Sequence, residues 1–132
     1  MSPSKRKLIS TGSPFELQYG YSRAVVDCGI VHISGTTGYD YATMTMPEDV
    51  AAQARNIYKT FAATLAQCGA VLEDIVRLRT FVTNADFLQT VCEVQGEVFA
   101  TIRPASSIFV ISGLLRPEMK VEIEADARLP NS

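Results

Sequence analysis

The most regular pattern in the chain lies near its C-terminus, in Lys120-Val121-Glu122-Ile123-Glu124-Ala125-Asp126-Ala127-Arg128. Apolar and charged residues alternate strictly there, which is typical of a β-strand with one buried and one polar face. Val121 and Ile123 begin the apolar side, and Glu122 and Glu124 begin the polar side. The apolar run 108–111 precedes this strand, across a polar loop with Gly and Pro at its borders. Two adjacent strands are therefore predicted.

Three short strands are expected in the N-terminal part, at 8–11, 23–27 and 30–34. Gly12-Ser13-Pro14 is expected to end the first strand. Cys28-Gly29 predicts a tight hairpin turn between the other two strands. The segment 35–38, with a glycine at each end, is expected to break the third strand.

A first helix is predicted from Thr45 as N-cap, with Pro47 and Glu48 in its first turn, to about Cys68 before Gly69. Its apolar residues recur at three- and four-residue intervals and predict a buried stripe. These residues are Val50, Ala54, Ile57, Phe61, Leu65 and Cys68.

The next strand is expected at 75–82, and a second helix from Asn84 or Asp86 to about Ile102. Gly96 lies inside that helix, where glycine costs about 1 kcal/mol against alanine, so we expect a close approach of helix and sheet there. One face of the strand is expected to carry Val76, Leu78, Thr80 and Val82.

The resulting order, β-β-β-α-β-α-β-β, predicts one α+β domain over residues 1–132, with a single sheet and both helices on one face. The other face of the sheet would lack a cover. Its apolar residues would have to be buried against another subunit, so we expect an oligomer.

Composition narrows the function classes. The chain has 132 residues and a net charge of −2, which gives no electrostatic footprint for nucleic acid or an anionic membrane. Its three cysteines lack metal-ligand spacing and are interpreted as buried free thiols. The basic cluster 5–7 is not followed by an apolar run, so we expect no signal peptide and a cytoplasmic location. No cofactor or metal motif is found.

Five segments together resemble the RidA family (reactive intermediate deaminase A, also called YjgF): 33–35, 49–55, 69–76, 81–82 and 120–125. The resemblance covers nearly the whole chain. It implies a chorismate-mutase-like fold, a homotrimer, and three ligand sites in the clefts between subunits.

The resemblance also implies site residues. Deaminating members hydrolyse 2-imino or 2-enamino acids, and their water-activating glutamate falls on Glu122. Their cleft serine falls on Ser34 and their cleft tyrosine on Tyr21. Their carboxylate-clamping arginine falls on Ser106, which is the main departure from the family's pattern.

A serine cannot replace the planar, always charged donor pair of a guanidinium. Losing that contact should cost several kcal/mol of binding, so amino-acid imines should be poor substrates. Ser106, Ser107 and Ile108 are expected to line the substrate site, where Ile108 makes the pocket more apolar and backbone donors near 106–108 would stabilise developing charge. Three arginines are candidates to supply the missing charge: Arg103, which we place among the substrate-binding residues, Arg23 and Arg116.

Each of the other polar candidates has a functional and a structural interpretation. Burial and repulsion by Glu124 would raise the pKa of Glu122 toward neutrality, although an acidic strand face is commonly just solvated. His32 could exchange protons but is more often structural. Tyr39 and Tyr41 either cover a ligand or anchor their loop.

The sequence therefore supports two hypotheses. The first is a cofactor-free enzyme that acts on a small imine, enamine or related unsaturated metabolite, with Glu122 as acid/base group. The second is a non-catalytic trimer that binds a small molecule, for instance in regulation. Endoribonuclease activity, also attributed to the family, fits poorly with an acidic chain.

Overall fold

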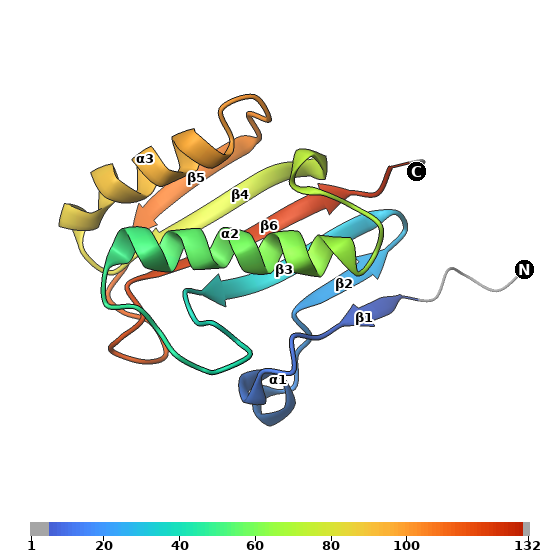
Figure 1. The fold of residues 1–132 in the computed structure, drawn as a ribbon, viewed down its shortest axis with the longest axis horizontal. Helices are drawn as coiled ribbons and strands as arrows, with labels where there is room; N and C mark the ends of the chain where they lie inside the picture. Colours follow the sequence, from blue (N-terminus) through green and yellow to red (C-terminus); the bar gives the residue numbers. More distant parts are fainter. Residues whose placement is uncertain (1–5, 131–132) are drawn as a thin grey trace, which may run out of the picture.

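The computed structural model describes residues 6–130, so Lys5 of the basic cluster lies outside the described residues. These residues form one six-stranded mixed sheet with the order β1-β2-β3-β6-β4-β5 (Figure 1). Only β4 and β5 pair in parallel, across the α3 connection. The strands are β1 (Lys7–Ile9), β2 (Ala24–Asp27), β3 (Ile30–Thr37), β4 (Ile75–Val82), β5 (Ala105–Val110) and β6 (Val121–Arg128).

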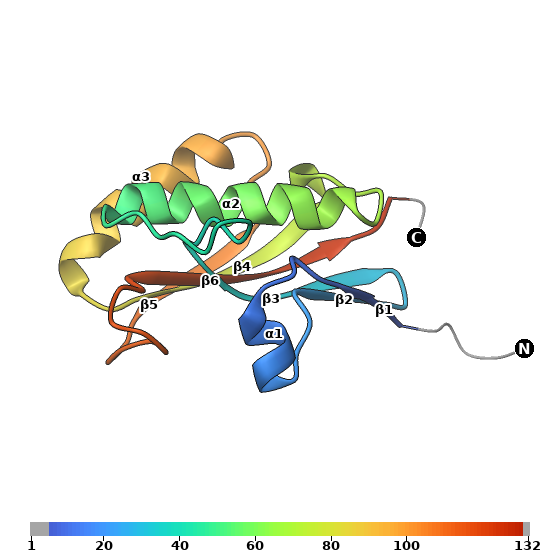
Figure 2. The ribbon, with the colours of Figure 1, turned by 60° about the horizontal axis from the view of Figure 1, so that its bottom comes forward.

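Helices α2 (Val50–Ala66) and α3 (Leu88–Val98) cover one face of the sheet, as predicted, and Figure 2 shows the other face largely open. Helix α1 (Pro14–Tyr19) lies on that open side, near the β1–β2 edge. Two short 3₁₀ turns, Leu72–Asp74 and Ala85–Phe87, precede β4 and α3. No helix among residues 6–130 is long and apolar enough to cross a membrane.

Helix α1 was not predicted, because its boundary residues were interpreted as the end of a strand. The Ser13 side chain accepts a hydrogen bond from Phe15 N, and Pro14 occupies the first turn. Gly20 ends the helix at φ 72°, a left-handed conformation that glycine adopts without strain. The helix is only six residues long, which is too short to show an apolar periodicity from which it could be predicted.

The core lies between the sheet and helices α2 and α3. The predicted alternation in β6 is confirmed, with its apolar side buried and its charged side on the open face. The predicted stripe of α2 is also confirmed for its members from Val50 to Leu65, whereas Cys68 is only partly buried. The prediction of buried thiols is wrong for Cys28 and Cys92, which are exposed.

The start of α2 differs from the prediction. Asp49, and not Thr45, is its N-cap, since the Asp49 carboxylate accepts from Ala52 N at 3.0 Å. Thr45 instead pairs with Asp40 in an isolated β-bridge that closes the preceding loop. A carboxylate next to the first helical N–H groups outcompetes a hydroxyl four residues earlier.

Strand β3 does not break at Gly35. It continues to Thr37 through an irregularity between Ile33 and Thr36, and Gly38 then touches α2 at Gln53. The hairpin prediction is confirmed, because Cys28 and Gly29 both have positive φ, 51° and 79°.

The bounds of β4 agree with the prediction, but a bulge between Ile75 and Arg77 leaves Val76 51% exposed. Asn84 caps the 3₁₀ turn before α3, and α3 ends at Val98 instead of Ile102. The expected close approach at Gly96 is wrong, because a Cβ there would meet nothing within 4 Å.

Candidate functional site

The candidate site lies on the open face of the sheet, around Glu122 in the middle strand β6. Glu122 pairs with Thr37 on one side and with Phe81 on the other. Its carboxyl group lies against the backbone of Gly35, and the residue is half-buried. Gly35 is thus the residue that leaves room for the carboxyl group.

Glu122 has the electrostatic setting of an acid/base group. Desolvation by burial, followed by the negative charge of Glu124, raises its pKa above the ordinary value, while the positive charge of Arg23 opposes that rise. A carboxyl group whose pKa is raised toward neutrality can both accept and return a proton. The predicted direction of this shift is confirmed.

Arg23, just before β2, is 0% exposed. Its Nη1 donates to Gly35 O at 2.9 Å and to Thr36 Oγ1 at 3.0 Å. On its other side, Nε lies 3.7 Å from Glu16 Oε2 in α1. Burial would raise the pKa of Glu16, but hydrogen bonds from Thr11 and Ser10 and the charge of Arg23 outweigh it and lower that pKa.

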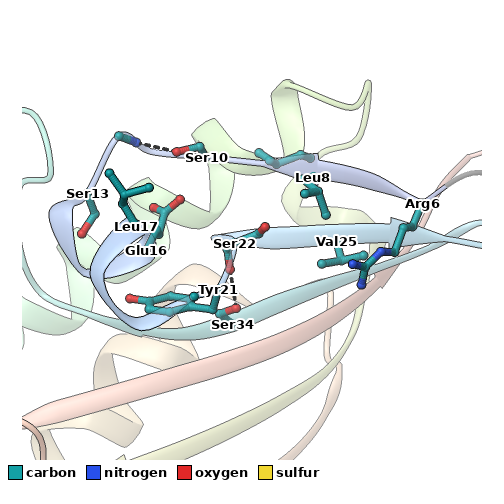
Figure 3. Close-up of a pocket in the computed structure, with 13 residues that line it drawn as sticks. Arg6, Leu8, Ser10, Ser13, Glu16, Leu17, Tyr21, Ser22, Val25 and Ser34 are labelled. Atoms are coloured by element: carbon teal, nitrogen blue, oxygen red, sulfur yellow. Dashed lines mark hydrogen bonds between the residues drawn. The ribbon is translucent and has the colours of Figure 1, made fainter.

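Tyr21 and Ser34 come together, as the resemblance implied, and both line a groove of about 780 Å³ between α1, β1 and the β2–β3 pair (Figure 3). Ser34 Oγ donates to Ser22 O at 2.6 Å. Tyr21 is 36% exposed, and burial raises the pKa of its phenol, so it stays protonated at neutral pH. The groove also contains exposed apolar residues, Leu8 and Leu17.

A row of aromatic side chains continues from Glu122 toward the edge of the sheet. Phe81 in β4 pairs with Glu122 and with Phe109 in β5, and the two rings stack at 5.7 Å. Phe109 remains 47% exposed. Glu122 therefore borders an apolar surface on one side and the Gly35 backbone on the other.

The far end of the open face is charged. Arg79 Nη1 lies 3.6 Å from both Glu124 Oε1 and Asp126 Oδ2. His32 Nδ1 lies 3.0 Å from Asp126 Oδ1, and His32 is 57% exposed. These contacts give His32 and Arg79 partners within the face, which agrees with a structural role for His32.

The β5 residues of the predicted site do not meet Glu122 of the same chain. Ser106 pairs with the core residue Leu78 and exchanges hydrogen bonds with the Gln95 side chain of α3, at 3.1 and 3.3 Å. It therefore points to the helix side of the sheet. Strand β4 also separates β5 from β6, which places the two strands about 10 Å apart.

The other β5 residues divide between the two faces. Ile108 packs against the core on the helix side, whereas Ser107 pairs with Arg79 on the open face. Arg103 is exposed at a positive φ of 57° and lines a shallow hollow at the α3–β5 edge together with Gln95. Arg103 and Ser106 are thus brought together around Gln95, away from Glu122.

The remaining candidates anchor loops. The guanidinium of Arg116 lies 5.4 Å from the Phe15 ring. Tyr39 is buried and donates to Glu118 at 2.8 Å, and the Tyr41 ring covers Arg23 at 4.7 Å. Among residues 6–130, no cluster of three or more His, Cys, Asp or Glu side chains is arranged to hold a metal ion.

Sequence reasoning missed the roles of Gly35, Glu16 and Phe109 at this site. The Gly35 contact depends on the β3–β6 register, which one sequence does not give. Glu16 sits on the unpredicted helix α1. The position of Phe109 could have been predicted, because it follows Ile108 in a strand and consecutive strand residues lie on opposite faces of the sheet.

These features define a class of protein: a small α+β domain with a half-buried carboxylate beside a groove on an open sheet face. Comparison with known proteins agrees. The family model described as Endoribonuclease L-PSP matches residues 13–129, so the chain belongs to this family, the YjgF/RidA family.

Solved structures share the fold. A Mycobacterium tuberculosis protein, described as a member of the highly conserved YjgF/YER057c/UK114 family, is 40% identical, with a TM-score of 0.86 over 95% of this chain and 100% of its own. A Yersinia pestis protein of unknown function from the Rid family is 30% identical, with a TM-score of 0.85 and the same coverage.

Curated relatives are more distant. The 2-iminobutanoate/2-iminopropanoate deaminase of Bos taurus is 29% identical over 96% of this chain and 93% of its own. An uncharacterised protein of Streptomyces coelicolor is 24% identical over 96% of this chain and 95% of its own.

Proposed function

We propose that this protein is a cofactor-free, homotrimeric enzyme that hydrolyses a small imine or enamine without an α-carboxylate, with Glu122 as its acid/base group. The observation that carries the proposal is the half-buried Glu122 carboxyl, whose pKa is raised and which lies against Gly35, the residue that follows Ser34 of the groove. The relatives named as imino-acid deaminases support this class of reaction.

The reaction is the addition of water to a C=N bond. Ionised Glu122 takes a proton from a water molecule while the water oxygen bonds to the imine carbon. The protonated carboxyl group then returns that proton to nitrogen, which gives a carbinolamine. The C–N bond breaks as the C=O bond forms, and the proton of the added hydroxyl group moves to the nitrogen, which leaves as ammonia. One imine and one water give one carbonyl compound and one ammonia. Tyr21 donates a hydrogen bond to the substrate.

The absence of a carboxylate from the substrate follows from the nearby cations. Ser106 stands where the family's pattern has an arginine, and Arg23 is buried and engaged by the protein. Arg79 is paired with two carboxylates of its own sheet. A substrate carboxylate next to Glu122 and Glu124 would therefore meet negative charge, and neither Arg23 nor Arg79 of the same chain would be free to compensate it.

The assembly completes the site in this proposal. The open face carries an exposed aromatic ring, and a second copy that covers it would desolvate Glu122 further. In a three-fold arrangement, the β5 edge of one copy, with Arg103 and Ser106, would face the Glu122 groove of the next.

The test measures hydrolysis of two imine classes generated in situ and compares each with the spontaneous rate. An amine oxidase supplies imines without a carboxylate, and an amino-acid oxidase supplies 2-iminopropionate and 2-iminobutyrate. The variants are Glu122→Gln, its matched control Glu124→Gln on the same strand face, and Ser106→Arg.

We expect the wild type to accelerate hydrolysis of the carboxylate-free imines, Glu122→Gln to abolish this, and Glu124→Gln to retain most of it. Ser106→Arg should gain activity on the 2-imino acids. Wild-type activity on 2-imino acids would overturn the argument from the missing arginine. A wild type that accelerates neither class would reject the enzyme and favour a binding protein.

A further inference from the structure

Arg23 is the largest fully buried side chain in the described part of the molecule. Withdrawing a guanidinium from water costs several kcal/mol unless its donors and charge find partners. Here Nη1 and Nη2 donate hydrogen bonds, whereas Nε is buried without a hydrogen-bond partner and has only the Glu16 carboxylate 3.7 Å away. The partners of Arg23 belong to the segments around the Glu122 site, except the loop residue Tyr41, whose ring lies 4.7 Å from the guanidinium.

One partner is the β3 irregularity. Nη1 donates to Gly35 O and to Thr36 Oγ1, while Thr36 Oγ1 itself donates to Ser34 O at 2.8 Å. Arg23 thereby fixes the backbone of residues 34–36. The carboxyl group of Glu122 lies against that same Gly35, so Arg23 and Glu122 share one residue between them.

A second partner is Tyr21. Nη2 donates to the Tyr21 hydroxyl oxygen across a long contact of 3.4 Å, and the guanidinium lies 5.5 Å from the Tyr21 ring. Arginine only donates, so the Tyr21 oxygen is the acceptor and its own hydrogen points elsewhere. Because Tyr21 lines the groove, that hydrogen is available to an acceptor on a molecule bound there.

The third partner is Glu16, whose carboxylate lies 3.7 Å from Nε and is held by Thr11 Oγ1 at 2.6 Å. This ion pair connects α1 to the site and balances the buried charge. With its donors directed into the protein, Arg23 does not serve as a carboxylate clamp, which was one of its expected roles.

We propose that Arg23 is a positioning residue of the Glu122 site: it holds the Tyr21 hydroxyl as a hydrogen-bond donor toward the substrate and places a fixed positive charge beside Glu122. The identity of the substrate rests on the proposed function, but the coupling of Arg23 to Glu122 and Tyr21 does not. The site would then accept a ligand with a proton-accepting atom at Tyr21 and a nitrogen at Glu122.

The coupling is measured on the protein without substrate, by following the Glu122 carboxyl carbon with NMR during a pH titration. Arg23→Gln removes the charge, and we expect the Glu122 midpoint to rise by about one pH unit. Arg23→Lys keeps the charge and should shift it less. Arg116→Gln, which removes an arginine stacked on Phe15, is the matched control and should leave the midpoint unchanged.

A folded Arg23→Gln variant with an unchanged midpoint, or an equal shift in Arg116→Gln, would overturn the proposal. Should Arg23→Gln fail to fold, the wild type supplies the same test. The side-chain nitrogen resonances of Arg23 must then move at the Glu122 midpoint, and resonances that stay constant through it would overturn the proposal as well.

The Tyr21 part is tested by a double-mutant cycle on imine hydrolysis. Tyr21→Phe and Arg23→Lys should each lower kcat, and the double variant should lose little more than one single variant, because both remove the same contact. Additive losses of kcat in the double variant would contradict the proposed coupling of Arg23 and Tyr21. If no imine is hydrolysed, the proposed function fails while the titration still decides on Arg23.

Discussion

The carboxyl group of Glu122 lies so close to Gly35 that a β-carbon on residue 35 would stand 2.8 Å from both Cδ and Oε2 of the glutamate. Real side chains essentially never approach that closely, so one of the two groups would have to move. The glutamate is the more flexible of the two. Position 35 therefore controls where the carboxyl group of Glu122, the proposed acid/base group, lies.

Gly35→Ala should consequently leave the protein folded and displace the carboxyl group, with a drop in imine hydrolysis of roughly ten-fold or more. Gly113→Ala is the control, because a Cβ at Gly113 meets nothing within 4 Å. Kinetics and circular dichroism of both variants check this. Full activity in Gly35→Ala would mean that the observed position of Glu122 is not the one that matters.

The carboxylates of half-buried Glu122 and buried Glu16 should change the stability of the fold with pH in opposite directions. The pKa of Glu122 is raised above 4.5, so the folded state loses stability as pH climbs from that value through the raised pKa. Glu122→Gln should therefore be more stable than the wild type at pH 7. The difference should vanish in acid, as urea denaturation at several pH values would reveal.

Glu16 should behave in the reverse way. Its pKa is lowered below 4.5, so its contribution is present above 4.5 and is lost as pH falls through the lowered value. Glu16→Gln should cost about 1–3 kcal/mol at pH 7 and progressively less in acid. The same denaturation series serves as the measurement, and a cost independent of pH would contradict the lowered pKa of Glu16.

Replacing each of two glycines by alanine should change the stability of the protein in opposite directions. A Cβ at Gly38 would lie 2.5 Å from the Gln53 backbone, so Gly38→Ala should destabilise the β3–α2 contact by about 1–3 kcal/mol. Gly96 is exposed in α3 with open space around it, so Gly96→Ala should stabilise by up to about 1 kcal/mol. Melting temperatures that move in the same direction would refute this assignment.

The proposed trimer predicts that charge on the open face prevents assembly. Phe109→Asp should shift the protein from trimer to monomer in sedimentation, because its ring would be covered by another copy. Val71→Asp replaces a comparably exposed apolar residue, next to the 3₁₀ turn Leu72–Asp74, and should leave the trimer intact. A wild-type monomer would reject the assembly outright.

A shared site also predicts complementation between subunits. Glu122→Gln and a variant that blocks the β5 edge, Ser106→Trp, should each be inactive alone. Mixed trimers refolded from equal amounts should recover about a quarter of wild-type activity, since that share of clefts combines two intact contributors. No recovery would place the whole site within one chain.

The sequence predicted those parts of the fold that depend on periodicity. The alternation in β6, the stripe of α2 and the bounds of β4 all follow from which residues are apolar, and they agree with the structure. Helix α1 was not predicted, because six residues are too few to show a helical period and because its capping residues also suit the end of a strand. The exposure of Val76 was not predicted, because a bulge between Ile75 and Arg77 interrupts the alternation of buried and exposed residues in β4.

The site was predictable only within single strands. The shared face of Glu122 and Glu124 follows from a spacing of two, and the direction of the Glu122 pKa shift followed from that spacing. The contact with Gly35 needs the register of β3 against β6, and the burial of Arg23 needs α1 in place. The helix-side orientation of Ser106 depends on its parallel pairing with β4.

The position of β6 between β3 and β4 has a consequence for biosynthesis. The strand made last joins β1-β2-β3 to β4-β5, and it carries Glu122. A chain still on the ribosome holds two separate half-sheets whose inner edges are unpaired and prone to associate wrongly. The sheet closes and Glu122 takes its place in one event, only once β6 has been made, so a chain that stops before β6 yields neither the fold nor the site.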